Sequence, residues 1–230
     1  VNAMCFDVSA ACSGFITALD IAASMLKAGS YKYALVIGSE KMSEIVNWKD
    51  RSVCVLFGDG AGAVVLKAVD NNTEDVTGAL VGHERGIIDS NIYNDGTGAS
   101  VLTGGRRFSD SCSTDIFIHM DGQEVFKFAV KSVPTAIETL LHNNNMDINE
   151  VDKFILHQAN VRIIESVAKR LKADKDKFPV NLNEYGNTSS ASIPILLDEL
   201  NRNGSLKQGE KLVLAGFGAG LSWGSILLVW

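Results

Sequence analysis

The sequence lacks several features that mark specialised classes of protein. It has 3 prolines against 21 glycines, which favours tight backbone approaches over flexible linkers. No stretch approaches the ~18 consecutive apolar residues of a membrane span, and the start has no basic segment typical of a signal peptide. Basic residues are fewer than acidic ones, 21 against 27, so nucleic acid is not the expected main partner. These absences indicate a globular protein, which we expect in the cytoplasm.

Cysteine is also scarce. The four cysteines, Cys5, Cys12, Cys54 and Cys112, show no CxxC spacing. Without a secretory signal we interpret them as free thiols in a reducing compartment. The His, Cys, Asp and Glu residues show no spacing typical of metal ligands, so we predict no metal site.

Hydrophobic periodicity predicts alternating helices and strands. Helical spacing covers residues 15–28, 124–143 and 163–171, and a further helix runs from a capping Ser192 to Asn203. Predicted strands cover residues 33–38, 53–57, 63–69, 151–156, 211–215 and 225–229. Residues 70–115 are polar and weakly periodic, and we expect mostly loop with short strands there. The order predicts a layered α/β or α+β protein with mixed sheets.

Two glycine-rich segments, residues 57–62 and 217–220, each join two predicted strands. Residues 58–63 also fit the dinucleotide pattern GxGxx(G/A), but that site needs a helix to follow, and here a β-branched run follows. We therefore predict tight hairpin turns. Their similar positions indicate two copies of one supersecondary unit.

Cys12 is the candidate nucleophile. It follows an apolar, extended-looking run at residues 4–11 and precedes a helical pattern. This predicts a strand-to-helix elbow, where the helix N-terminus favours the thiolate.

A histidine and an asparagine are candidate partners of Cys12. His157 ends a predicted strand, and Asn187 lies in the donor-rich segment 183–190 just before a helix. A structural histidine and ordinary turn chemistry are the simpler interpretations. A functional set of Cys, His and Asn fits two chemistries. One is a papain-like hydrolase, although the flanks of Cys12 do not match that family's signature. The other is thioester acyl transfer, in which His and Asn both donate to one carbonyl oxygen. Periodicity does not decide between them.

Three motifs together resemble the β-ketoacyl-[acyl-carrier-protein] synthase III family. They are DVSAACSGF at residues 7–15, HQANVRI at 157–163 and GNTSSASIP at 186–194. Residues 57–62 and 216–224 also match. The resemblance implies a thiolase-like α/β fold of two similar halves, each with a five-stranded sheet between helices. We expect the halves at residues 1–120 and 121–230. It also implies that the first third of the usual protein is absent, so we expect a missing N-terminal segment or a complementary chain.

The resemblance implies the reaction that initiates fatty acid synthesis. An acyl-CoA acylates Cys12, and malonyl-[acyl-carrier protein] then undergoes decarboxylative Claisen condensation with the acyl group. His157 and Asn187 hydrogen-bond the malonyl thioester oxygen, and the backbone N–H groups of Cys12 and Ala219 form the oxyanion hole. The family usually has glycine where Ala219 stands, and a positive φ there would cost about 1 kcal/mol. No cofactor is implied, because the CoA thioesters are substrates.

Further residues take roles only through the resemblance. Arg51 matches a residue that stacks on the CoA adenine, and Phe126 and Asn160 match the pantetheine tunnel. Gln158 and Arg162 match contacts to the carrier protein. A homodimer is also implied.

Three alternatives stay open beside this interpretation. One is a related acyltransferase of secondary metabolism that transfers acyl groups without decarboxylation. Another is the cysteine hydrolase, and the last is a non-catalytic fragment that needs a complementary chain.

Overall fold

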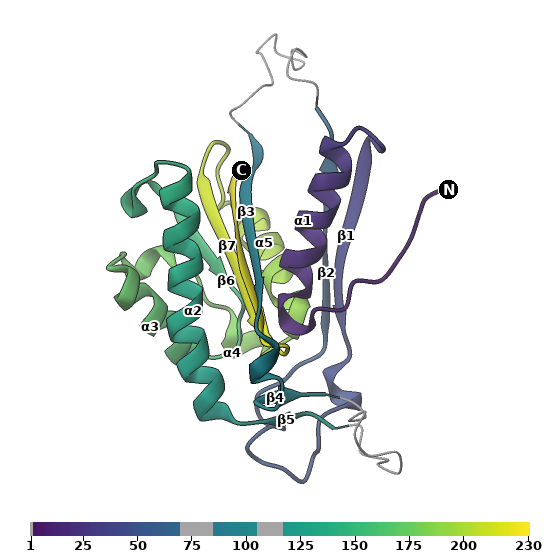
Figure 1. The fold of residues 1–230 in the computed structure, drawn as a ribbon, viewed down its shortest axis with the longest axis vertical. Helices are drawn as coiled ribbons and strands as arrows, with labels where there is room; N and C mark the ends of the chain where they lie inside the picture. The colour runs from purple at the N-terminus through teal and green to yellow at the C-terminus, as the bar shows by residue number, and fades with distance from the viewer. Residues whose placement is uncertain (1, 70–84, 105–116) are drawn as a thin grey trace.

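The computed structural model describes residues 2–69, 85–104 and 117–230 (Figure 1). In this part of the chain the α-helices are α1 (Gly14–Lys27), α2 (Gly122–Asn143), α3 (Val161–Leu171), α4 (Leu182–Tyr185) and α5 (Ser192–Arg202). The strands are β1 (Tyr33–Glu40), β2 (Gly60–Lys67), β3 (Gly86–Asn94), β4 (Leu102–Thr103), β5 (His119–Met120), β6 (Lys153–Leu156), β7 (Lys211–Gly218) and β8 (Ser222–Val229). The predicted helices are confirmed to within a few residues. None of the described helices is long and apolar enough to cross a membrane.

A mixed four-stranded sheet has the order β3-β8-β7-β6. The strands β6 and β7 run parallel, and the other pairs are antiparallel. The strand β3 lies where mostly loop was predicted, because its sequence GIIDSNIYN is polar and weakly periodic. Since β3 pairs with β8, a division at residue 120 does not follow the sheets. Two other parts of the predicted loop, residues 70–84 and 105–115, lie outside the described residues.

Helices cover both faces of this sheet (Figure 1). Side chains of β7 alternate between the two faces, as a pleated strand requires. Val213 and Ala215 pack into the core shared with α2 and α3, whereas Leu212 and Leu214 pack into the core shared with α1 and α5. Because both faces are covered, β7 is apolar almost without interruption.

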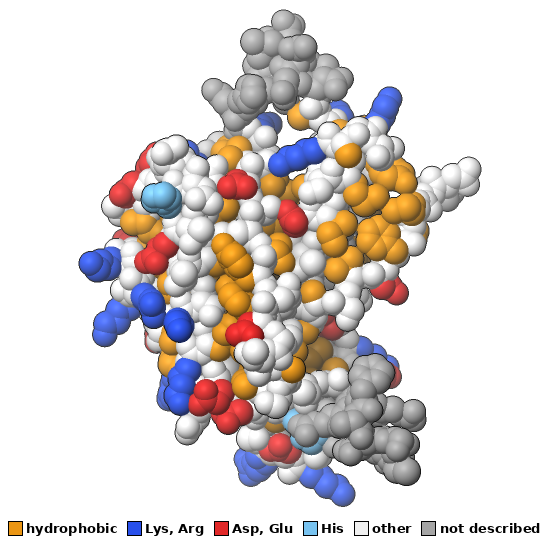
Figure 2. Space-filling view, viewed as in Figure 1, with side chains coloured by type: hydrophobic (Ala, Val, Ile, Leu, Met, Phe, Trp, Pro, Cys, Tyr) orange, Lys and Arg blue, Asp and Glu red, His pale blue; other side chains and the backbone are white. Residues whose placement is uncertain are grey.

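The strands β1 and β2 form a separate antiparallel pair on the far side of α1 and α5 (Figure 1). Val36 is 4% exposed, whereas its neighbour Leu35 is 63% exposed. The predicted strand at residues 33–38 is therefore present, but only one of its faces is buried although its sequence is apolar throughout. Figure 2 shows hydrophobic side chains gathered over this side of the molecule, on the right of the view.

Two predicted strands are not present. Residues 2–10 form no strand, and Met4 and Phe6 are more than half exposed. An extended segment becomes a strand only when neighbouring backbone groups pair with it, and no described strand does so here. Residues 53–56 form successive turns instead of a strand, with the Val53 N–H donating to Asp50 O, and Phe57 forms only an isolated bridge with Asn187.

The second half of the first glycine-rich segment, residues 60–62, is strand, which corrects the predicted turn. Gly60 and Gly62 are the first and third residues of β2. A Cβ at Gly62 would lie 2.8 Å from the backbone nitrogen of Ile195, so the absence of a side chain lets α5 approach β2 closely.

Candidate active site

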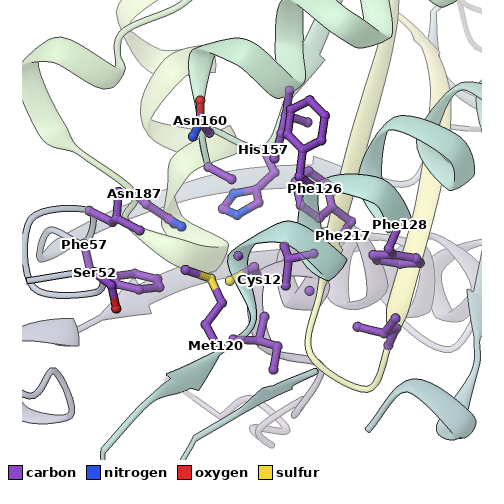
Figure 3. Close-up of a pocket in the computed structure, with 18 residues that line it drawn as sticks. Cys12, Ser52, Phe57, Met120, Phe126, Phe128, His157, Asn160, Asn187 and Phe217 are labelled. Atoms are coloured by element: carbon purple, nitrogen blue, oxygen red, sulfur yellow. The ribbon is translucent and has the colours of Figure 1, made fainter. Parts of the chain in front are cut away.

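Cys12, His157 and Asn187 line one cavity, as predicted for a common site (Figure 3). The cavity has a volume of about 180 Å³. The rest of its lining is mostly apolar: Leu56, Phe57, Leu102, Met120, Val125, Phe126, Phe128, Ile163, Phe217 and Leu221. A few polar side chains, those of Cys12, His157 and Asn187 together with Ser52 and Asn160, therefore lie in a largely apolar chamber, which is typical of a small-molecule or cofactor site.

Cys12 occupies a sharp elbow at the start of α1. It lies in a single 3₁₀ turn, Ala11–Ser13, that runs directly into the helix. Ala11 has a φ of 46°, a left-handed conformation that costs a non-glycine residue energy. The Ser13 hydroxyl donates to Ala10 O at 2.7 Å and lies 2.5 Å from the Ser222 hydroxyl, which ties the elbow to β8. The predicted elbow is confirmed, although no strand leads into it.

The Cys12 thiol is protonated at neutral pH. Burial raises its pKa to about 11, a hydrogen bond from Ser189 lowers the pKa, and the Glu40 carboxylate raises it. The bond from the Cys12 backbone has a smaller lowering effect. The prediction that the helix start makes a thiolate is therefore wrong for the free thiol, because burial disfavours the charged form. At pH 7 the thiolate fraction is about 10⁻⁴.

His157 lies directly after β6 and is 2% exposed. Its backbone N–H donates to Ala215 O at 2.8 Å, and its ring lies edge-on to Phe217 with 5.2 Å between centroids. Its Nδ1 is 2.7 Å from Ser192 Oγ. Burial lowers the pKa of the imidazole to about 3, so His157 is neutral at physiological pH.

Asn187 is 6% exposed and is held by both its backbone and its side chain. Its N–H donates to Leu56 O at 2.8 Å, and its carbonyl accepts from Gly58 N–H at 3.0 Å. Its Oδ1 accepts the Ser189 N–H at 2.9 Å. Because the amide oxygen is engaged in this way, the Nδ2 donors face the cavity, where Figure 3 shows the nitrogen beside the His157 ring.

The serine-rich segment around Asn187 contributes more to the site than the sequence indicated. Glu40 accepts hydrogen bonds from the backbone and the hydroxyl of Ser190, at 3.2 and 2.6 Å. Ser192 was predicted to cap a helix, but it is the first residue of α5, and Ala191 before it makes no side-chain cap. Its hydroxyl lies against His157 instead. The serines and threonine of residues 188–192 are visible in the sequence. Their role at the site was missed because such residues are also common in turns and helix caps.

The second glycine turn reaches Cys12. A Cβ at Gly218 would lie 2.8 Å from the Cys12 nitrogen, so only a glycine permits this approach. Ala219 is not among the described non-glycine residues with positive φ, which are Ala11, Asn145, Lys172 and Ser189. The expected energetic cost of Ala219 is therefore not incurred, because its backbone conformation suits an L-residue.

The predicted CoA-binding residues separate into two groups. Phe126 and Asn160 line the cavity. Asn160 also caps α3, because its Oδ1 accepts the Arg162 N–H at 2.9 Å. Arg51 is exposed and does not line the cavity, whereas the adjacent Ser52 does.

One predicted carrier-protein contact is corrected. Gln158 is 1% exposed, and its Nε2 donates to Leu156 O while its Oε1 accepts from Asn181 N–H. It braces the His157 loop internally and cannot contact a carrier protein. Arg162, by contrast, is exposed near the start of α3. Within the described residues, no group of three or more His, Cys, Asp or Glu side chains could hold a metal ion.

Known proteins match this chain along its whole length. Residues 6–96 match the family 3-oxoacyl-[acyl-carrier-protein (ACP)] synthase III, and residues 141–230 match the C-terminal part of the same family. The β-ketoacyl-[acyl-carrier-protein] synthase III of Clostridium acetobutylicum is 46% identical over 100% of this chain and 68% of its own length.

Solved structures show the same relationship. The 3-oxoacyl-[acyl-carrier-protein] synthase III of Aquifex aeolicus VF5 superposes with a TM-score of 0.87 at 44% identity, covering 98% of this chain and 67% of the other. The enzyme of Pseudomonas aeruginosa PAO1 gives 0.88 at 36% identity, covering 100% and 68%. The fold is the thiolase-like α/β fold, and the chain belongs to the 3-oxoacyl-[acyl-carrier-protein] synthase III family.

Proposed function

We propose that this protein is the initiating condensing enzyme of fatty acid synthesis, with Cys12, His157 and Asn187 as its catalytic residues. The observation that carries the proposal is the orientation of Asn187. Its amide oxygen is bonded to the Ser189 N–H, so its donors face the cavity beside a neutral histidine and the cysteine. Two neutral donors facing one point suit an oxygen that becomes negative during the reaction.

Acylation comes first. Cys12 Sγ attacks the carbonyl carbon of an acyl-CoA, a C–Sγ bond forms, and the bond to the CoA sulfur breaks. The thiol proton leaves Cys12 and ends on the CoA thiolate, so charge is conserved. The hydrogen bond from Ser189 favours the thiolate as it forms. The backbone N–H groups of Cys12 and Ala219 are the proposed donors to the tetrahedral oxyanion.

Condensation follows with malonyl-[acyl-carrier protein]. Cleavage of the bond to the malonyl carboxylate releases CO₂ and leaves an enolate on the thioester. His157 and Asn187 donate to the enolate oxygen, and the carbanion attacks the acyl carbonyl on Cys12. The C–Sγ bond breaks, the 3-oxoacyl product leaves, and Cys12 regains a proton from solvent. Because decarboxylation itself generates the carbanion, the step needs no strong base, cofactor or metal.

The geometry disfavours the cysteine hydrolase. A papain-like site needs an asparagine that orients the histidine and a thiolate that pairs with an imidazolium. Here Ser192 bonds the His157 ring, and Asn187 bonds Ser189. Burial keeps both the thiol and the imidazole neutral, since it raises one pKa and lowers the other.

Partners are part of the proposal. Arg162 is exposed beside the cavity-lining residue Asn160, and Lys169, Arg170 and Lys172 are exposed on the same helix or just after it. Glu165 is the one acidic residue of α3 and is also exposed, so this surface has a net positive charge and suits an acidic carrier protein. We also propose a homodimer, to which the exposed apolar face of β1 and β2 gives support. A cytoplasmic location agrees with the free thiols of Cys5, Cys12 and Cys54.

Intact mass spectrometry with a panel of short acyl-CoA primers tests the proposal. We expect one acyl group per chain, located on the peptide that contains Cys12, and a 3-oxoacyl product after malonyl-[acyl-carrier protein] is added. Cys12→Ser should lose the stable thioester label and the product, and Cys54→Ala should keep both. No acylation by any primer would contradict the proposal, whereas acyl transfer without CO₂ release would identify the non-decarboxylating acyltransferase instead.

A further inference from the structure

Ser192 is a buried serine whose hydroxyl lies against the face of His157 that points away from the cavity. The distance from Ser192 Oγ to His157 Nδ1 is 2.7 Å, and Ser192 is 2% exposed. The hydroxyl accepts the Gln158 N–H at 3.3 Å and lies 2.9 Å from Ser189 O. The Ser192 hydroxyl has one proton, which can be donated either to His157 Nδ1 or to Ser189 O. The choice of acceptor determines which nitrogen of the His157 ring carries the hydrogen.

The neutral imidazole carries one N–H, on either Nδ1 or Nε2. If the Ser192 proton points to Ser189 O, Nδ1 must carry the hydrogen and donate to Oγ. Nε2 then presents a lone pair to the cavity. If the proton points to Nδ1, then Nε2 carries the hydrogen and presents a donor to the cavity. The two arrangements give the catalytic face of His157 opposite chemistry.

The hydrogen-bond pattern favours the second arrangement. Ser189 O already accepts the backbone N–H of Ser192, so it keeps a partner when the hydroxyl turns away. Oγ still accepts from Gln158 N–H while it donates to Nδ1. No polar group loses its last partner. The distance from Ser192 Oγ to His157 Nδ1, 2.7 Å, is shorter than the distance of about 2.9–3.0 Å typical of an N–H donor, and it is the distance expected when a hydroxyl is the donor.

The position of Ser192 in α5 explains why its hydroxyl is available. A serine at the start of a helix normally accepts backbone N–H groups of the first turn. Here no side-chain cap forms, and the 3₁₀ turn Ser189–Ala191 leads directly into α5. The local backbone therefore leaves this hydroxyl free to bond the histidine.

We propose that Ser192 is a positioning residue that donates its hydroxyl to His157 Nδ1 and holds the imidazole as its Nε2–H tautomer. This rests on the proposed function, in which His157 must donate to the enolate oxygen. Ser192 thereby serves the condensation step and not the acylation of Cys12. A ring held in this tautomer cannot accept the Cys12 proton at Nε2, so the two half-reactions differ in their need for Ser192.

Nitrogen-15 NMR of the histidine-labelled protein tests the tautomer without any substrate. Protonated and bare ring nitrogens have well-separated shifts, and the His157 signals are assigned by their loss in His157→Gln. We expect Nε2 protonated and Nδ1 bare in the unsubstituted protein. A protonated Nδ1 would overturn the proposal even if the protein is an active synthase. A failure of the proposed function would instead appear as a lack of condensation and would leave the NMR result unchanged.

Variants of Ser192 test its consequence for activity. Ser192→Ala should lower the condensation rate about tenfold or more, as expected when a catalytic imidazole loses the partner that sets its tautomer, with acylation of Cys12 unchanged. Ser192→Thr keeps the hydroxyl and should restore most of the rate. Ser225→Ala removes another buried serine, which bonds Asn91, and should leave the His157 shifts and the ratio of the two half-reactions unchanged. If Ser192→Ala retains both the tautomer and the condensation rate, Ser192 has no positioning role.

Discussion

The two sides of the cavity are held very differently. His157 and Asn187 belong to buried segments whose backbones bond to β7 and to the loop at residues 56–58. Cys12 is attached to a segment, residues 2–10, that is mostly exposed and pairs with no described strand. The same contrast separates the two sheets, because helices cover both faces of the four-stranded sheet and one face of the β1–β2 pair.

This difference indicates that the oxygen-binding side of the site is preorganised by the chain itself. Fixed donors in a dry cavity cost little reorganisation during the reaction, which is the main source of their catalytic effect. The nucleophile depends on its own elbow, on the Ser13–Ser222 contact and on Gly218. Perturbing either side of the cavity separately therefore tests this contrast.

The largest expected effect concerns the reactivity of the Cys12 thiol. Because burial raises its pKa to about 11, the rate of alkylation by iodoacetamide should rise about tenfold per pH unit, or ~10³-fold from pH 7 to pH 10. Peptide-level mass spectrometry measures this rate, and Cys12→Ser gives the background. A rate that levels off near pH 8 would show that the elbow does lower the pKa.

The same thiol affects stability. Its folded pKa lies above the ordinary value of 9.0, so the folded state holds a proton that the unfolded state loses between about pH 9 and pH 11. The contribution of the Cys12 thiol to the free energy of unfolding is full below pH 9. It is lost as the pH rises from about 9 to about 11, by up to about 1.4 kcal/mol per pH unit. Urea unfolding of the unsubstituted protein and of Cys12→Ser across these pH values measures it, and equal slopes would contradict the raised pKa.

Asn187→Asp tests the preorganised side. Aspartate keeps an oxygen for the Ser189 N–H, but it replaces the two amide donors with a charge that repels the enolate. We expect the condensation rate to fall about 10²–10³-fold, as for the loss of an oxyanion donor, with little change in fold. Product formation from pre-acylated protein measures the rate, and circular dichroism controls for folding. Condensation at the unsubstituted rate would show that Asn187 acts only as a turn residue.

Gly58→Ala tests the loop that supports Asn187. A Cβ at Gly58 would lie 2.1 Å from Tyr185 O, so the backbone must shift at the point where Gly58 N–H bonds Asn187 O. We expect a loss of about 1–3 kcal/mol in the free energy of unfolding, together with slower condensation. Gly96→Ala is the matched control, because its Cβ would meet nothing within 4 Å, and it should change stability by less than about 0.5 kcal/mol. An equal loss in the free energy of unfolding for Gly58→Ala and Gly96→Ala would show that close packing at Gly58 does not matter.

The smallest expected effect compares the two faces of β1. Val36 faces α1 and α5, whereas Leu35 faces outward. Val36→Ala should lower the free energy of unfolding by about 1–2 kcal/mol, and Leu35→Ala by less than about 0.5 kcal/mol. Chemical unfolding of both variants measures this. A larger loss for Leu35→Ala would mean that another surface covers the outer face in solution, which would itself support the proposed dimer.

Much of the fold could be predicted from local sequence. Helix periodicity predicted α1, α2 and α3, and the positive φ of Gly29 and Gly204 agrees with helix ends at those positions. The strand β3 and the missing strand before Cys12 were mispredicted, because strand formation depends on neighbours that are distant in sequence. The apolar residues 4–8 have strand composition, but no described strand pairs with them.

The site could be predicted as a set of residues but not as chemistry. The motifs around Cys12, His157 and Asn187 predicted a common site, and in the structure all three residues line one cavity. The charge states depend on burial, which no local pattern shows, and so the thiolate prediction was wrong. Similarly, Gln158 resembled a surface contact within its motif, but tertiary packing turns it inward. The sequence around Ser192 fits both a helix cap and a hydrogen-bond partner of His157, and only the three-dimensional structure distinguishes the two roles.

The half-reactions of His157→Ala test the central claim most directly. CoA release without malonyl substrate measures acylation of Cys12, and 3-oxoacyl product after addition of malonyl-[acyl-carrier protein] measures condensation. We predict one CoA released per chain at near the unsubstituted rate and a condensation rate reduced about 10²-fold or more, as for loss of a donor to the developing charge. A variant in which acylation falls as far as condensation would contradict the account, because His157 would then be the base for Cys12 and not the donor to the enolate.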